Sequence, residues 1–114
     1  MTALLVAAGA FLGAPLRYLV ASRLDDERFP HGTLVVNVAG SFVLGLLSGA
    51  AVTGDWLALL GVGFCGGLTT YSSFAVQTHR LGRARGAAYA AATIGPALAA
   101  CALGYLLGHV VGQA

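Results

Sequence analysis

A polar interruption inside a long apolar stretch constrains the fold of this chain most strongly. Residues 63–77 read Gly-Phe-Cys-Gly-Gly-Leu-Thr-Thr-Tyr-Ser-Ser-Phe-Ala-Val-Gln. Adjacent glycines each weaken a helix by roughly 1 kcal/mol relative to alanine, so a helix break is predicted at Gly66-Gly67. Backbone groups freed inside a bilayer must be buried in protein or line a cavity, because lipid cannot hydrogen-bond to them. We therefore expect this stretch to form a functional site.

The composition indicates an integral membrane protein. Of the 114 residues, 58% are hydrophobic and 9% are charged, and the mean hydropathy is +0.84. A formal net charge of +2, without a basic cluster interleaved with aromatic residues, argues against nucleic-acid binding. No Lys or Arg precedes the first apolar run, so we expect this run to remain in the mature protein rather than act as a signal peptide.

Four apolar spans are predicted, each near the ~20 residues that cross the hydrocarbon core. They cover residues 2–22, 32–53, 56–78 and 86–111. Because the connections are short, successive helices should be antiparallel neighbours. We expect residues 1–114 to form one all-α domain of four transmembrane helices, the third broken at its centre. One such bundle encloses little protected volume, so a polar break also predicts an oligomer.

Polar side chains recur on three of these spans. The second carries Asn37, Ser41 and Ser48, and the fourth carries Tyr89 and Thr93. The third carries Thr70, Ser73 and Gln77 on one face, with Tyr71 and Phe74 on the adjacent face. Each hydroxyl taken alone is explained by hydrogen bonding within or between helices. The carboxamide of Asn37 needs several partners in a span without charges. Together these residues predict a track for a small hydrated solute or ion.

Acidic residues are absent from the predicted spans. Asp25, Asp26, Glu27 and Asp55 all fall in loops. A proton-coupled cation exporter needs an intramembrane carboxylate, which argues against the alternative of a four-span multidrug exporter. Hydroxyl and amide donors with electropositive ring edges suit an anion instead. The three histidines lie near membrane edges and predict neither catalysis nor a metal cluster, so the chain is not expected to be an enzyme.

Three sequence motifs, taken in order, carry a resemblance to a known family. They are Gly13-Ala14 with Arg17-Tyr18, then Gly-Thr-Leu-Val-Val-Asn at 32–37 with Gly-Ser-Phe at 40–42, then the stretch 63–74. In this order they resemble the Fluc (CrcB) fluoride channels over nearly the whole chain. The resemblance implies an antiparallel dual-topology dimer in the plasma membrane, with two pores that export cytoplasmic fluoride passively. It also implies a structural sodium ion at the dimer centre.

The resemblance further implies roles for individual residues. The matched positions are the two sodium-binding backbone carbonyls of Gly66 and Thr69, the pore amide of Asn37, the pore phenylalanine Phe74, the hydroxyl residues Ser72 and Ser73 beside it, and Tyr89 and Thr93 on the polar track of the fourth helix. Arg17 matches an arginine at the end of the first helix, where anion attraction and a snorkelling anchor are both open. The pattern has three departures: Tyr71 replaces the second pore phenylalanine, Gln77 a common glutamate and Ala97 a frequent serine.

The distribution of arginine predicts how the chain inserts. The first and third loops share one side of the membrane and hold Arg23, Arg28, Arg80, Arg83 and Arg85, whereas the other side holds none. This bias predicts a single orientation with these loops in the cytoplasm. One interpretation is a heterodimer with an oppositely inserted homologue, and the other is a homodimer in which the charge rule is overridden. A third possibility is a non-conducting scaffold that completes a partner's pore.

Overall fold

The structure is a computed structural model that describes residues 2–26 and 28–113 of the 114-residue chain. Its elements are α1 (Thr2–Leu24), α2 (His31–Gly49), α3 (Gly54–Trp56), η1 (Leu57–Cys65), α4 (Gly66–Leu68) and α5 (Tyr71–Gln113). The described part of the chain contains helices and the short segments that join them, which confirms the all-α prediction.

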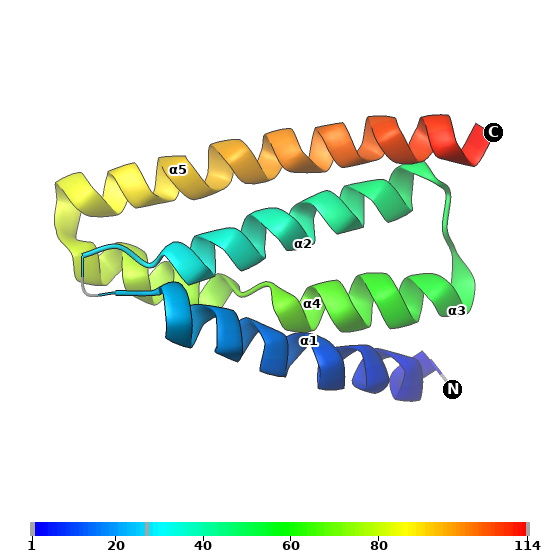
Figure 1. The fold of residues 1–114 in the computed structure, drawn as a ribbon, viewed down its shortest axis with the longest axis horizontal. Helices are drawn as coiled ribbons and strands as arrows, with labels where there is room; N and C mark the ends of the chain where they lie inside the picture. Colours follow the sequence, from blue (N-terminus) through cyan, green and yellow to red (C-terminus); the bar gives the residue numbers. More distant parts are fainter. Residues whose placement is uncertain (1, 27, 114) are drawn as a thin grey trace.

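The elements after α2 form two antiparallel arms (Figure 1). The outward arm, residues 54–81, contains α3, η1, α4 and the start of α5. At Gly82 the backbone adopts φ 86° and ψ −174°, a left-handed conformation that glycine reaches at little steric cost. The return arm, residues 83–113, then runs back beside α2. The start of α1 and the end of α5 lie at the end of the bundle that holds α3, opposite the reversal between the two arms (Figure 1).

The loop between α1 and α2 is held by two carboxylates. Asp25 accepts hydrogen bonds from the Thr33 amide (2.9 Å) and the Thr33 hydroxyl (2.8 Å), which places negative charge at the N-terminus of α2. Asp26 Oδ1 accepts from the amides of Arg28 and Phe29, each at 2.7 Å. These backbone donors hold the pKa of Asp26 below its ordinary value of 3.8. The Asp26 carboxylate is therefore charged at neutral pH and accepts both backbone bonds in that form.

Glycine allows the helices to pack closely. α2 packs mainly against α5, and α1 packs against η1 and α4. A Cβ atom on Gly45 of α2 would collide with the backbone carbonyl of Cys101, and one on Gly108 would collide with the carbonyl of Leu46. Glycine at both positions lets the α2 and α5 backbones meet directly, as small residues do in membrane helix pairs.

The helix break predicted at Gly66-Gly67 is wrong in its position. Both glycines are helical within α4, and the interruption falls at Thr69 and Thr70, with Thr69 extended at φ −85° and ψ 161°. Gly67 serves close packing instead, because a Cβ there would lie 3.0 Å from the Cα of Ala10 in α1. The preceding segment, η1, is π-helical, and the Gly66 amide that follows it bonds back to the Gly61 carbonyl.

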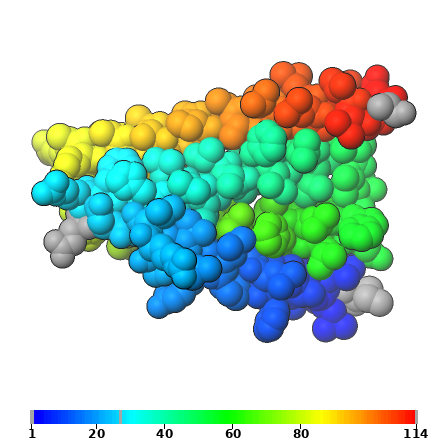
Figure 2. Space-filling view, in the orientation of Figure 1, coloured from blue at the N-terminus to red at the C-terminus, as the bar shows by residue number. Residues whose placement is uncertain are grey.

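The described helices are apolar enough to cross a bilayer. By length and composition three stretches qualify: Thr2–Leu24, His31–Gly49 and the 60 residues of Gly54–Gln113, which contain the Gly82 reversal. The molecule measures 44 × 29 × 19 Å, so its thin direction is about two helix diameters. Figure 2 shows α1 and the return arm at the two edges of one face, with α2 between them. Large apolar side chains such as Phe11 (78% exposed) and Leu98 (68%) remain uncovered.

Candidate functional site

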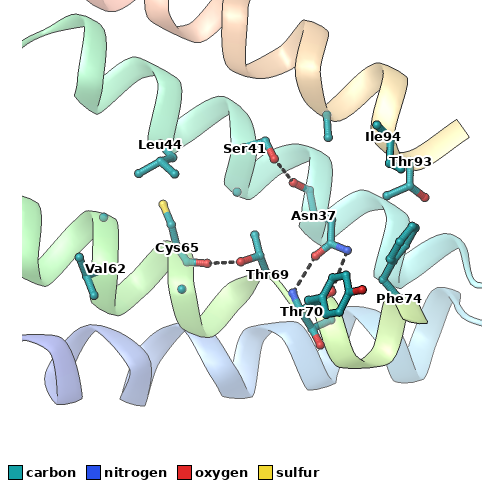
Figure 3. A pocket seen from close by; sticks show the side chains of 15 residues that line it. Asn37, Ser41, Leu44, Val62, Cys65, Thr69, Thr70, Phe74, Thr93 and Ile94 are labelled. Carbon is teal, nitrogen blue, oxygen red and sulfur yellow. Dashed lines mark hydrogen bonds between the residues drawn. The ribbon is translucent and has the colours of Figure 1, made fainter. Parts of the chain in front are cut away.

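A cleft of about 650 Å³ lies beside the helix interruption (Figure 3). Its walls come from α2, η1, α4, the Thr69-Thr70 link and both arms of α5, and most of its lining is apolar. Six of the residues assigned roles from the sequence line this cleft: Asn37, Gly66, Thr69, Tyr71, Phe74 and Thr93. The structure thus brings together residues from three of the four predicted spans.

Asn37 binds the interruption at two points. Its Oδ1 accepts from the Thr70 amide at 2.8 Å, and its Nδ2 donates to the Thr70 carbonyl at 3.1 Å (Figure 3). This pairing fixes the orientation of the carboxamide, because a backbone amide only donates and a carbonyl only accepts. The Thr70 backbone therefore supplies two of the hydrogen-bond partners expected for Asn37. The second hydrogen on Nδ2 takes no part in these two bonds.

The hydrogen bonds at the interruption leave two carbonyls without their usual helical donors. In a continuous helix the Thr70 amide would bond the Gly66 carbonyl, and the Ser73 amide would bond the Thr69 carbonyl. Here the Thr70 amide donates to Asn37 Oδ1, and the Ser73 amide donates to Thr70 Oγ1 at 3.1 Å. The carbonyls of Gly66 and Thr69 therefore stay available to another partner beside the cleft.

The carbonyl of Cys65 is saturated, in contrast. It accepts from the Thr69 amide at 2.9 Å and from the Thr69 hydroxyl at 2.8 Å. Both lone pairs of this oxygen are occupied. The Thr69 hydroxyl is consequently directed back along α4 (Figure 3), and its proton is committed to the Cys65 carbonyl.

A row of aromatic rings leads from the cleft to the first loop. Ring centroids are separated by 6.3 Å between Tyr71 and Phe74, 5.4 Å between Phe74 and Tyr89, and 5.3 Å between Tyr89 and Phe29. Phe29 also lies 4.8 Å from His31. Tyr89 is fully buried, whereas Tyr71 is 80% exposed at the other end of the row. Sequence reasoning did not find Phe29, because loop residues carry no periodicity that would place them on a helix.

Two buried hydroxyls lie one turn apart on the return arm. Tyr89 Oη and Thr93 Oγ1 have no hydrogen-bond partner among the described residues. A buried polar atom without a partner is costly, so such atoms commonly take a water or a ligand. Thr93 lines the cleft, so its hydroxyl can donate to a small solute there, whereas Tyr89 is buried behind the cleft lining.

Comparison with known proteins assigns the chain to a family. Residues 4–108 match the family described as CrcB-like protein, Camphor Resistance (CrcB). The chain belongs to the CrcB family. A protein of Rhodococcus jostii (strain RHA1) named Fluoride-specific ion channel FluC 2 is 53% identical over 112 residues, which cover 94% of this chain and 98% of the relative. In Rhodospirillum rubrum, a protein named Fluoride-specific ion channel FluC is 41% identical over 96% of this chain and 93% of its own length.

Membership in the CrcB family confirms the resemblance seen in the motifs. The relatives are named as fluoride-specific ion channels, which places this CrcB chain in a family of multi-pass membrane channels rather than enzymes. The apolar helices agree with this class.

Some residues singled out from the sequence lie outside the cleft of this CrcB chain. Ser72 is exposed, with its hydroxyl 3.3 Å from Thr70 Oγ1, and Ser73 takes part through its amide. Arg17 is half-buried in α1 and does not line the cleft. Gln77 accepts from Arg80 Nε at 2.9 Å and from a terminal guanidinium nitrogen of Arg80 at 2.7 Å.

Proposed function

We propose that this CrcB protein is a subunit of a fluoride channel in the plasma membrane. Fluoride that enters a cell as neutral hydrogen fluoride ionises at cytoplasmic pH and is trapped, and the channel lets it leave down its electrochemical gradient. The observation that carries this proposal is the lining of the cleft, where an amide, hydroxyls and aromatic rings meet and the described lining residues include no carboxylate. Donors and ring edges at close quarters can replace the hydration shell of an anion.

Four membrane crossings account best for the shape of the chain. The longest dimension of 44 Å matches a bilayer with its headgroup regions, about 40–45 Å. The 60-residue apolar stretch reverses at Gly82, so its two arms supply two crossings beside those of α1 and α2. The first loop and the residues around Gly82 then share one membrane surface, with Arg23, Arg28, Arg80, Arg83 and Arg85.

A second subunit is needed to enclose the pore. Val62 and Tyr71 line the cleft although they are 59% and 80% exposed in the single chain. A layer 19 Å thick offers little cover for a polar path through lipid. An antiparallel dimer with two pores would cover this wall with the same face of a partner.

The carbonyls of Gly66 and Thr69 fit a structural sodium ion. They come at the C-terminal end of a helix, where carbonyls carry partial negative charge, and their usual amide donors bond elsewhere. Unwound carbonyls of this kind coordinate sodium in other membrane proteins. Each chain would contribute two oxygens, and a twofold axis would double them. The ion would supply positive charge that holds the two interrupted helices together.

The partner can be a second copy or a homologue. Five arginines near one membrane surface favour a single orientation, and with it a heterodimer whose other subunit inserts the opposite way. Related proteins named FluC 1 and FluC 2 occur, as expected where an organism holds more than one such chain. In a heterodimer this chain either lines a working pore or completes the partner's pore.

Growth of a fluoride-sensitive bacterial strain tests the proposal in cells. A strain without its own fluoride exporter should grow at higher fluoride concentrations when it expresses this chain, alone or with an oppositely inserted homologue. Asn37→Leu and Phe74→Ala should reduce the protection at equal membrane levels. If both variants protect the strain as well as the wild type does, this subunit lines no fluoride path.

A further inference from the structure

We propose that the side chains of Asn37 and Thr70 create the cation site without touching the ion. Each side chain accepts a hydrogen bond from a backbone amide that would otherwise bond one of the two carbonyl ligands of the ion. This inference rests on the proposed sodium site. It assigns to both residues a positioning role that is separate from any contact with fluoride.

The first amide is diverted from another helix. Thr70 N–H lies 2.8 Å from Asn37 Oδ1, and the return bond from Nδ2 to the Thr70 carbonyl holds the pair in register. The two residues are 33 positions apart, so the state of the Gly66 carbonyl depends on how α2 packs against the outward arm. Gly40 permits that approach, since a Cβ there would collide with the Thr69 side chain.

The second amide is diverted locally. Thr70 Oγ1 accepts from the Ser73 amide at 3.1 Å, three residues on, as an N-cap residue does at the start of a helix. Thr70 is only 8% exposed, so its hydroxyl is not free to turn to solvent. Without this acceptor the Ser73 amide would be released toward the Thr69 carbonyl, and α5 would extend backwards through the site.

The two hydrogen bonds act on the two sides of Thr70. The bond from the Thr70 amide to Asn37 keeps Thr70 out of α4, and the bond from the Ser73 amide to Thr70 Oγ1 starts α5 after Thr70. Thr69 and Thr70 therefore stay outside both helices. Loss of the Asn37 or the Thr70 acceptor should let the released backbone amide bond its helical carbonyl, and cation binding should weaken. Loss of a hydroxyl elsewhere on α5 should leave cation binding unchanged.

A sodium titration of purified protein tests this without any measurement of flux. Thermal unfolding in detergent is followed as sodium chloride replaces N-methyl-D-glucamine chloride at constant ionic strength, and the sodium concentration at half of the stabilisation is recorded. Thr70→Val and Asn37→Leu should raise that midpoint by about tenfold, which corresponds to ~1.4 kcal/mol. Thr70→Ser, which keeps the acceptor, should have the wild-type midpoint.

Thr78→Val is the matched control. The Thr78 hydroxyl donates to the Phe74 carbonyl at 2.8 Å, and Thr78 lies outside the cleft, so its removal should leave the sodium midpoint unchanged. If Thr70→Val does not fold, Thr70→Ala removes the same acceptor with less bulk. Wild-type midpoints in the Thr70 and Asn37 variants would overturn the positioning role while the cation site stands. A wild-type protein that sodium does not stabilise would overturn the cation site itself, and the inference with it.

Discussion

Phe74 packs against Tyr89 with ring centroids 5.4 Å apart and an interplanar angle of 38°. This contact joins the outward and return arms of α5 on either side of the Gly82 reversal. Tyr89 is in turn met edge-on by Phe29 from the first loop, with centroids 5.3 Å apart. Phe74, whose ring borders the cleft, is therefore positioned by Tyr89, which does not line the cleft.

Phe29→Ala should destabilise the protein, because it removes one aromatic partner of the buried Tyr89. Such a pair contributes about 0.5–1.5 kcal/mol beyond the area it buries, so the thermal midpoint in detergent should fall measurably. Phe11→Ala is the control, since Phe11 is 78% exposed on α1. Equal midpoints for the two variants would show that Phe29 does not support the row of rings.

Substitutions at Tyr71 separate a pore-lining role from a scaffold role. Tyr71 is 80% exposed in the single chain, so Tyr71→Phe should alter stability by less than about 0.5 kcal/mol. Its fluoride efflux should remain close to that of the wild type, because the ring edge is kept. Tyr71→Ala removes the edge and should reduce efflux strongly. Full efflux in Tyr71→Ala, measured with a fluoride electrode, would show that this position lines no pore.

Gly45→Ala should be strongly destabilising. The added methyl group would meet the backbone of Cys101, including its carbonyl carbon at 2.9 Å, and backbone atoms cannot turn aside as a side chain can. Overpacking of this kind typically costs about 1–3 kcal/mol. Gly95→Ala is the matched control, because nothing lies within 4 Å of its Cβ position. Comparable loss of folded protein in both variants, followed by size-exclusion chromatography, would contradict the close α2–α5 packing.

Reporter fusions at the C-terminus measure orientation. The five arginines of the first loop and the Gly82 region predict a C-terminus outside the cytoplasm, so an external reporter should be active and a cytoplasmic one silent. Replacing these arginines and adding lysines at both termini should reverse the two signals. Equal signals from both reporters on the native chain would favour a homodimer and remove the argument for an oppositely inserted partner.

The helical class was predictable from the sequence, because it follows from the length of the apolar spans and the scarcity of charge. The main polar residues were predictable because they stand out within those apolar spans. The position of the interruption was not. Gly66-Gly67 has the lowest helix propensity nearby, yet both residues remain helical. The chain leaves the helix at Thr69 instead, where Asn37 and Thr70 capture the next amides. A contact between residues 33 positions apart overrides local propensity here.

Several features of the site depend on tertiary structure alone. Phe29 contacts Tyr89 from a loop position where its amide is bonded to Asp26, and no periodic pattern in the sequence encodes that contact. The sequence places Gln77 on the polar face of the third span, and only the fold shows that its amide binds Arg80 and does not line the cleft. By contrast, the shared helix face of Tyr89 and Thr93 follows from the sequence alone, because a helix places residues four positions apart one turn from each other.

Fluoride efflux from liposomes tests the central claim most directly. Two preparations are compared: this chain purified alone, and this chain purified with a co-expressed copy whose charge bias is inverted so that it inserts the opposite way. At least one preparation should release fluoride rapidly while chloride is retained. Activity of the chain alone would show a working homodimer, and activity only with the inverted copy would show that opposite insertion is required. Retention of fluoride in both preparations, or equal release of chloride, would contradict the assignment as a fluoride channel.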